Sequence, residues 1–365
     1  MADKLSPGDK VCVLTSGGDA PGMNSALRGL ARVGAELGLE MVGAEDGYEG
    51  LLAGRFVPLD IRALDEASRR GGTALGTARS ARFRTPEGQE TARRVIREAG
   101  IAALVVIGGN GSLTGAAVLE GCDAARGPLR VAGLPASIDN DLGGTSMAIG
   151  VDTAMNTIVE ACDRICDTAR AHRRVFLVEV MGRDCGYLAM TAGVSAGADT
   201  VLVPESDRTE EELVAQVCHT IERAHADGDR RRRVLILKSE GVKMPTATLK
   251  ERVDARLASE HHEIDSRVTV LGHVVRGGTT WAFDRLLAVR LANAAVRGLF
   301  DGRSGFMAGW VGPGVTTPPC PYDPYVVLVP LAEMLAETEK LHRGESALAM
   351  WRKRVYREVE SVLER

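Results

Sequence analysis

Directly after the apolar segment 129–134 comes the stretch Pro135-Ala136-Ser137-Ile138-Asp139-Asn140-Asp141. If that segment is a buried parallel strand, its carboxyl end is where an open α/β sheet presents groups to a ligand. In extended backbone Asp139 and Asp141, two residues apart, project to the same side. One carboxylate can take a proton from a substrate hydroxyl while the other helps a metal ion, a division of labour that phosphoryl transfer requires. The same residues followed by Leu142-Gly143-Gly144 are equally good turn chemistry, so both interpretations remain open here.

The composition is that of an ordinary globular protein with room for two domains: 365 residues, 45% apolar and 26% charged. The longest apolar runs, such as 102–107 and 175–180, have the length of strands, which argues against a membrane partner. The start, Met1 to Ser6, lacks the apolar core of a signal peptide, which predicts a cytoplasmic location. A net charge of −4 argues against nonspecific nucleic-acid binding.

Seven cysteines are scattered along the chain without a Cys-x-x-Cys pair, which indicates reduced thiols. Cys162 and Cys166 lie one helical turn apart. We expect them to pack in a helix rather than to bind zinc.

Short apolar segments alternate with amphipathic ones along most of the chain. The alternation predicts strands at 11–15, 41–44, 104–107, 131–134, 175–180, 200–203, 234–237 and 268–271, and helices at 23–37, 91–99, 148–168, 210–226 and 253–261. Parallel sheets with helices on both faces have this pattern, so the predicted fold class is doubly wound α/β. We expect the prolines at 313, 318, 319, 321 and 324 to end the alternation, and segment 331–365 to be mainly helical.

Two glycine-rich loops follow predicted strands and lead into predicted helices. They are Thr15-Ser16-Gly17-Gly18-Asp19-Ala20-Pro21-Gly22-Met23-Asn24 and Gly108-Gly109-Asn110-Gly111-Ser112. Glycine lets a phosphate approach bare backbone N–H groups, and the positive end of a helix attracts the anion. Neither loop has the Gly-x4-Gly-Lys-Ser/Thr or the Gly-x-Gly-x-x-Gly pattern. Each loop alone can be a plain turn, but two such loops and an Asp pair after a third strand favour one shared sheet edge.

The ordered motifs resemble those of the 6-phosphofructokinase family. The matching segments are 15–24, 107–112, 138–141, 181–183 and 271–278, which run in family order from about residue 10 to about residue 310. The resemblance implies phosphorylation of fructose 6-phosphate at its 1-hydroxyl with ATP and Mg²⁺, a step of glycolysis. It also implies a discontinuous nucleotide-binding domain at 1–144 and 268–330, a sugar-phosphate-binding domain at 145–267 and a helical C-terminal segment at 331–365.

The resemblance gives four residues a part in phosphoryl transfer. Asp139 is expected to be the general base for the 1-hydroxyl, and Asp141 to assist at the metal and sugar side. Ser137 is expected near the transferred group, and Arg183 is expected to stabilise its developing charge, because a guanidinium keeps its charge and offers several donors.

Other residues are assigned to ligands in the same way. The resemblance implies sugar contacts from Met181, Gly182 and Glu240, and 6-phosphate contacts from His273 and Arg276 together with Arg174 and Arg267 of a neighbouring subunit. It implies nucleotide contacts from Gly18, Tyr48, Arg79, Asn110, Gly111 and Ser112, with Asn110 and Asp141 at the metal. Arginines borrowed across an interface imply a homo-oligomer, typically a tetramer.

The family uses either ATP or pyrophosphate, and two positions distinguish the donors. Pyrophosphate enzymes typically have Asp at the position of Gly111, which crowds and repels a nucleotide, and Lys at that of Ala136. Both residues of this chain therefore favour ATP. One departure concerns Asn110, which stands where the family usually has a metal-facing Asp. Its amide oxygen can still hold Mg²⁺ or a bound water, but it removes one negative charge, so we expect weaker Mg²⁺–nucleotide use.

Regulation and alternative functions stay open at this point. Arg28 and Arg32 share a helix face, Arg230 to Arg233 precede a strand and Glu205 ends another, in regions where allosteric members bind effectors. Cys166 stands where such members can carry Arg, and a solvated basic surface is the alternative. A pyrophosphate-dependent enzyme and a non-catalytic regulatory subunit remain rivals. A Rossmann dehydrogenase is disfavoured, because the first strand lacks the dinucleotide pattern.

Overall fold

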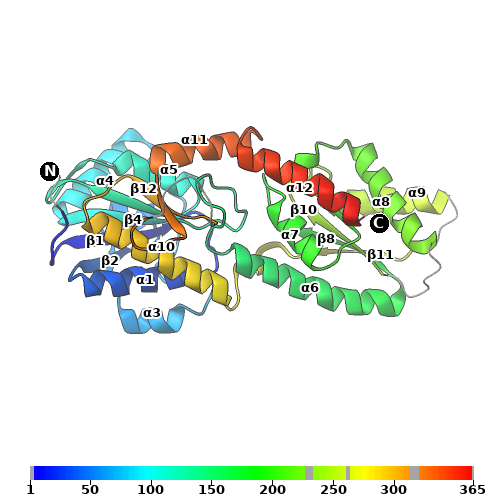
Figure 1. Cartoon of the computed structure of the whole chain (residues 1–365), viewed down its shortest axis with the longest axis horizontal. Helices are drawn as coiled ribbons and strands as arrows, with labels where there is room; N and C mark the ends of the chain where they lie inside the picture. The colour runs from blue at the N-terminus through cyan, green and yellow to red at the C-terminus, as the bar shows by residue number, and fades with distance from the viewer. Residues whose placement is uncertain (1–3, 227–232, 260–263, 313–319, 364–365) are drawn as a thin grey trace. The chain divides into compact units, whose positions relative to one another are not determined.

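A computed structural model describes residues 4–226, 233–259, 264–312 and 320–363. The chain forms two compact units (Figure 1). Unit 1 comprises Met1–Ile138, Leu142–Thr153 and Arg276–Lys340, and unit 2 comprises Asp139–Asp141, Ala154–Val275 and Leu341–Arg365.

Unit 1 contains a seven-stranded sheet in the order β13-β12-β7-β4-β1-β2-β3. Its central pairs are parallel, while β2–β3 and β12–β13 are antiparallel. The central strand β4 is buried at every residue, as a parallel strand covered on both faces requires. The strands are β1 (Lys10–Ser16), β2 (Glu40–Ala44), β3 (Phe56–Pro58), β4 (Ile101–Gly108), β7 (Arg130–Pro135), β12 (Phe306–Trp310) and β13 (Val326–Pro330).

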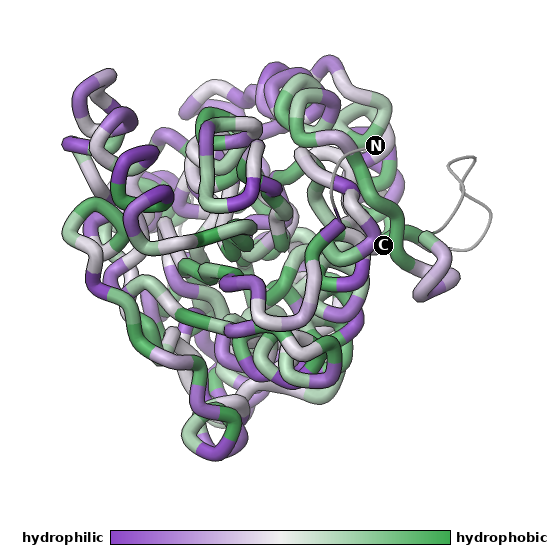
Figure 2. Tube along the Cα trace, turned by 90° about the vertical axis from the view of Figure 1, so that its left-hand side faces the viewer, coloured by the Kyte–Doolittle hydropathy of each residue, from purple (hydrophilic) through white to green (hydrophobic). Residues whose placement is uncertain are grey.

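Helices cover this sheet, and among them α1 packs directly on α10. A Cβ added at Gly29 of α1 would lie 2.9 Å from the Cβ of Ala292 in α10, so glycine permits this approach. Figure 2 shows that hydrophobic and hydrophilic stretches alternate along the trace. The helices are α1 (Met23–Glu36), α2 (Tyr48–Ala53), α3 (Ile61–Ala67), α4 (Pro86–Glu98), α5 (Asn110–Leu119) and α10 (Ala282–Phe300), with the short pieces η1 (Arg82–Arg84), β5 (Asp123–Ala124) and β6 (Gly127–Pro128).

Unit 2 contains a four-stranded parallel sheet in the order β11-β8-β10-β9. Its strands are β8 (Val175–Val180), β9 (Thr200–Leu202), β10 (Val234–Ser239) and β11 (Ser266–Val270). Apolar residues of α8 (Glu210–Ala226) and α9 (Thr246–Ser259) pack on this sheet in one core. The remaining elements are α6 (Val151–His172), α7 (Tyr187–Ser195), η2 (Pro204–Ser206), η3 (Gly272–Arg276), α11 (Leu331–His342) and α12 (Ala347–Leu363). Three of them, α6, η3 and α11, have residues in both units.

The predicted fold class is confirmed, and each predicted strand corresponds to an observed one. Several details differ or go beyond the predicted elements. The alternation does not end at the proline cluster, since β13 follows it; Pro313, Pro318 and Pro319 lie outside the described residues. Segment 331–365 is mainly helical, as predicted, and is divided into two helices because Gly344 adopts φ 74° and Ser346 caps α12 by accepting from the Ala349 N–H. The helix α10 was not predicted.

The unit boundaries also differ from the expected domain boundaries at 144, 268 and 331. Segment 266–270 is β11, which pairs with β8, so the chain returns to unit 1 only at Arg276. Segment 331–340 belongs to unit 1, where Leu331 and Met334 join its core.

Among the described residues, no helix combines the length and the apolar character needed to span a bilayer. All seven cysteines are free thiols, and Cys162 and Cys166 are buried in α6.

Candidate functional site

Three adjacent strands of unit 1 end in the loops that the sequence singled out. The strands β7, β4 and β1 are parallel neighbours, so their carboxyl ends lie at one edge of the sheet. A Cβ added at Gly17 would lie 3.2 Å from the Ser112 Oγ, and one added at Gly109 would lie 3.9 Å from the Ser137 Cβ. The structure therefore brings both glycine loops and Ser137 together at this edge.

Two helices begin at this edge, α1 with a buried N-terminus and α5 with a partly exposed one. The N-caps of α1 and α5 are Gly22 and Gly109, neither helix has a side-chain cap, and neither has an acidic residue in its first turn. The first N–H groups of a helix have no partner inside it, and the helix dipole makes this end positive. The partly exposed N-terminus of α5, beside the glycine backbone of the first loop, is therefore a suitable surface for phosphate groups.

Asn110 and Gly111 occupy the first turn of α5. Gly111 is exposed, and a Cβ added there would meet no atom within 4 Å, so the space beside it is open. Asn110 is half-buried, and its backbone carbonyl accepts from the Thr114 hydroxyl at 2.9 Å. Ala136 is buried at the end of β7.

Tyr48 lies beneath the second loop rather than on the surface. Its ring is only 4% exposed and stacks on Phe83 at 4.1 Å between ring centroids. Its hydroxyl donates to the Ser112 carbonyl at 2.7 Å, and burial raises the pKa of this phenol. Tyr48 thus supports the start of α5 from inside the core.

Arg276 lies against the first glycine loop. Its Nη1 donates to the Asp19 carbonyl at 2.8 Å, and a Cβ at Gly18 would lie 2.9 Å from that same nitrogen. Glycine at position 18 therefore makes room for the guanidinium. Arg79, the arginine expected near the nucleotide, is exposed in the segment that follows Thr77.

Thr77 and Asn24 hold segment 73–77 against the first glycine loop. Neither was predicted as a site residue. The Thr77 hydroxyl donates to the Gly17 carbonyl at 2.8 Å. The Asn24 side-chain oxygen accepts from the Ala74 N–H at 2.7 Å. In the sequence, Asn24 could have been identified because it belongs to the first glycine-rich stretch, whereas Thr77 belongs to no motif.

In unit 2, the acidic stretch is a turn and not an extended segment. Asn140 adopts φ 52°, in the left-handed region, so the premise of extended backbone for Asp139 and Asp141 is wrong. Asp141 lies 3.4 Å from the His342 Nε2, and this carboxylate raises the pKa of the imidazole. Asp141 and Arg183 line one cavity of about 480 Å³.

The residues expected at the sugar lie at the carboxyl ends of neighbouring parallel strands in unit 2. Met181 and Gly182 follow β8, Glu240 follows β10, and exposed His273 lies just after β11. The Gly182 N–H points to the Glu240 carboxylate at 3.4 Å. Gly182 has φ 129°, and a Cβ there would lie 2.5 Å from the Cys185 carbonyl oxygen, so this tight turn requires glycine.

Arg174 and Arg267 are not brought to this edge. Arg174 precedes β8 and Arg267 is the second residue of β11, so both lie at the amino ends of their strands. Both pair with Asp265, the Arg174 Nε at 2.6 Å, and Arg174 holds the pKa of that carboxyl below its usual value. Within one chain they form a separate charged cluster.

The residues considered for an effector site are dispersed. Arg28 and Arg32 both pair with Asp65 beside a cavity of about 430 Å³ in unit 1. The Glu205 carboxylate of unit 2 accepts from the Gly186 N–H at 2.8 Å. Arg230 to Arg232 lie outside the described residues.

The described residues contain no group of three or more His, Cys, Asp or Glu side chains arranged to hold a metal ion. Mg²⁺ is commonly held by one or two protein oxygens together with substrate phosphates, so a sparse protein contribution is compatible with it.

Comparisons with known proteins agree with this geometry. A family model described as Phosphofructokinase matches residues 10–299. The chain is 44% identical over 300 residues to a protein of Natranaerobius thermophilus named ATP-dependent 6-phosphofructokinase, covering 82% of this chain and 89% of that protein. It is 43% identical over 337 residues to ATP-dependent 6-phosphofructokinase 1 of Thermus thermophilus, covering 92% of this chain and 96% of that one.

Solved structures show the same relationship. Phosphofructokinase from Saccharomyces cerevisiae superposes with a TM-score of 0.80 at 35% identity, covering 92% of this chain but 46% of that chain, so this chain spans about half its length. A pyrophosphate-dependent phosphofructokinase from Marinobacter aquaeolei superposes with a TM-score of 0.76 at 21% identity, covering 89% of this chain and 83% of that chain, which shows the shared fold alone. With a family model that covers most of its length and relatives above 40% identity, this chain belongs to the phosphofructokinase family.

Proposed function

We propose that this protein transfers the γ-phosphoryl group of ATP to the 1-hydroxyl of fructose 6-phosphate, as an ATP-dependent 6-phosphofructokinase of glycolysis. The observation that carries the proposal is family membership together with the uncapped N-terminus of α5 and the glycine loops at one sheet edge. That edge is built to receive phosphates.

Unit 1 supplies the nucleotide side in this proposal. Backbone N–H groups around Gly18, Gly111 and Ser112 bind the phosphates, and Ser137 lies beside them. Exposed Arg79 contributes a cation for the same phosphates. Tyr48 acts by holding the Ser112 turn in place.

Unit 2 supplies the acceptor side. The Asp139 carboxylate takes the proton of the 1-hydroxyl as the hydroxyl oxygen bonds to the γ-phosphorus and the bond to ADP breaks. Arg183 stabilises the charge on the phosphoryl oxygens. Met181, Gly182 and Glu240 hold the sugar, and this assignment is supported by their place at one sheet edge.

Mg²⁺ is proposed as the cofactor. The Asn110 amide oxygen and the Asp141 carboxylate would help to hold it, and both are oxygen ligands of the type it prefers. When bound, it neutralises charge on the phosphates.

ATP is the proposed donor rather than pyrophosphate. The open space beside Gly111 supports it, because a side chain at this position would project toward the start of α5 where the phosphates bind. Ala136 also supports ATP, because it lacks the positive charge of the Lys that pyrophosphate-dependent enzymes typically have at this position.

A homo-oligomer, typically a tetramer, is proposed as the assembly, with 6-phosphate contacts from His273, Arg276 and a neighbour's Arg174 and Arg267. The position of the last two at the amino ends of their strands, away from Met181 and Glu240, supports a role toward another subunit. The free thiols are compatible with work in the cytoplasm, where cysteines stay reduced.

An assay with two donors tests the function. Purified protein with fructose 6-phosphate and Mg²⁺ is given ATP or pyrophosphate in parallel, with the Asp139→Asn variant as control. We expect turnover with ATP and a loss of about 10²-fold or more in the variant. Turnover with pyrophosphate alone would favour that rival, and sugar-phosphate binding without turnover would favour a regulatory subunit.

A further inference from the structure

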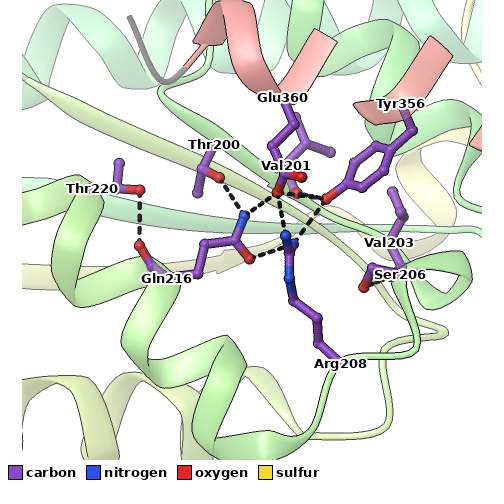
Figure 3. Close-up of polar contacts among 9 residues, drawn as sticks. All are labelled: Thr200, Val201, Val203, Ser206, Arg208, Gln216, Thr220, Tyr356 and Glu360. Carbon is purple, nitrogen blue, oxygen red and sulfur yellow. Dashed lines mark hydrogen bonds and ion pairs between the residues drawn. The ribbon is translucent and has the colours of Figure 1, made fainter. Parts of the chain in front are cut away.

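The C-terminal helix α12 lies outside the segment that the family model matches, yet it is fastened to unit 2 by an extended polar network (Figure 3). The Tyr356 hydroxyl donates to the Val201 carbonyl at 2.8 Å. The Glu360 carboxylate pairs with Arg208 at 2.7 Å and accepts from the Gln216 amide at 2.7 Å. These contacts tie α12 to β9 and α8 and fix its position within unit 2.

On this fixed helix, Arg352 is a buried cation, with only 6% of its surface exposed. Its Nη2 donates to the Asn140 carbonyl at 2.7 Å, its Nη1 lies 3.4 Å from the Cys185 Sγ, and its guanidinium stacks over the Tyr187 ring at 4.8 Å. Among the described residues, no carboxylate forms an ion pair with Arg352, and the Arg352 Nε has no hydrogen-bond partner. The carboxylates of Asp141 and Glu205 line the same cavity as Arg352, but the group to which its guanidinium is hydrogen-bonded is the Asn140 backbone carbonyl.

The group that Arg352 holds is the centre of the acidic turn. Asn140 is 1% exposed, adopts the left-handed conformation at φ 52°, and its side chain is hydrogen-bonded to Tyr187. Its carbonyl belongs to the peptide plane that joins it to Asp141. A donor that fixes this plane therefore fixes how the chain leaves Asn140 toward Asp141, and it restricts the turn that also carries Asp139.

We propose that Arg352 is a positioning residue for phosphoryl transfer: from a helix beyond the family-matched segment, it orients the Asp139–Asp141 turn through the Asn140 carbonyl. The inference rests on the proposed function, because it assumes that these carboxylates serve the reaction. Small displacements of reacting groups have large effects on rate, which is why one hydrogen bond to a backbone carbonyl can matter here.

The test compares three variants with the parent protein. Arg352→Met removes charge and donors but keeps much of the length, whereas Arg352→Lys keeps the charge and one donor. Tyr356→Phe is the matched control, because it lies on the same buried face of α12 and loses its bond to Val201 without touching Asn140. We measure kcat and KM with ATP and fructose 6-phosphate, and deuterium uptake of the backbone at 136–142.

We expect Arg352→Met to lower kcat by about 10- to 100-fold with KM values changed by less than about threefold. Deuterium uptake at 136–142 should rise in the same variant, Arg352→Lys should recover part of kcat, and Tyr356→Phe should keep the parent kcat. If Arg352→Met does not fold, Arg352→Lys carries the comparison, with an intermediate loss of kcat expected.

Two results would overturn the inference alone: parent-like kcat in the Arg352 variants, or an equal loss in Tyr356→Phe, which would mean that only helix docking matters. A parent protein without turnover would instead overturn the proposed function and remove the basis of the inference.

Discussion

Replacing Asp284 by Asn should change how stability depends on pH, because this carboxyl is buried at the junction of α10 with the start of α6. It is fully buried, and it accepts from the backbone N–H groups of Gly150 at 2.8 Å and Thr153 at 2.7 Å. Burial raises its pKa to about 6, above the ordinary value of 3.8. Between these two values the folded protein keeps a proton that the unfolded chain has released. The stabilisation from this proton is fully present below about pH 3.8 and is lost as the pH rises through about 6.

The size of the effect follows from the two pKa values. A shift of about two units corresponds to about 3 kcal/mol in total, of which about 1.4 kcal/mol is lost between pH 5 and pH 7.5. The amide that replaces the carboxyl in Asp284→Asn does not titrate, and its different hydrogen bonds add only an offset that is independent of pH. The free energy of unfolding of the parent minus that of Asp284→Asn should therefore fall by about 1.4 kcal/mol from pH 5 to pH 7.5.

Urea denaturation at constant ionic strength measures this difference. Asp65→Asn is the control, because Arg28 and Arg32 lower the pKa of Asp65 and its titration lies below pH 5. Its difference from the parent should stay flat over the same range. A flat or growing difference for Asp284→Asn would refute the reasoning.

Three further predictions concern the proposed site. Asn110→Asp should raise turnover at low Mg²⁺, because it restores a negative charge beside the metal; a Mg²⁺ titration of kcat that is unchanged or worse would count against this. Gly111→Asp should fold normally, since the space beside Gly111 is open, but should lower kcat/KM for ATP by about tenfold or more through repulsion of the phosphates. ADP or phosphoenolpyruvate should shift the half-saturation for fructose 6-phosphate if the Arg28 and Arg32 region binds effectors, and the absence of any shift in a titration would reject that hypothesis.

The sequence predicted the fold well where apolar runs are short and end at glycine. Strand β4 is such a run, and the loops after β1 and β4 follow from the same signal. By contrast, α10 was not predicted. Its sequence is rich in alanine and leucine and lacks a clear polar face, because the helix is buried on several sides. The helix break at Gly344 was missed because one glycine in a charged helical pattern is a weak signal.

The site could be predicted as a set of residues but not in its geometry. The turn at Asn140 agrees with its local turn chemistry, but the hydrogen bond that its carbonyl accepts comes from Arg352, which is 212 positions away in the chain, so no local pattern indicates that contact. Tyr48 was assigned to the nucleotide from the family resemblance, but its burial under Ser112 depends on how α2 and α5 pack on the sheet. Long-range contacts of this kind decide which groups hold a loop and which remain exposed.

The most direct test of the central claim follows the phosphorus itself. The protein is incubated with ATP, Mg²⁺ and fructose 6-phosphate, and ³¹P NMR monitors the γ-phosphorus, with Asp139→Asn in a parallel sample. We predict that the γ signal is replaced by a phosphate ester on carbon 1 of the sugar, and that the variant leaves ATP intact over the same time. Release of inorganic phosphate without the sugar ester, or an equally fast reaction in the variant, would contradict the account.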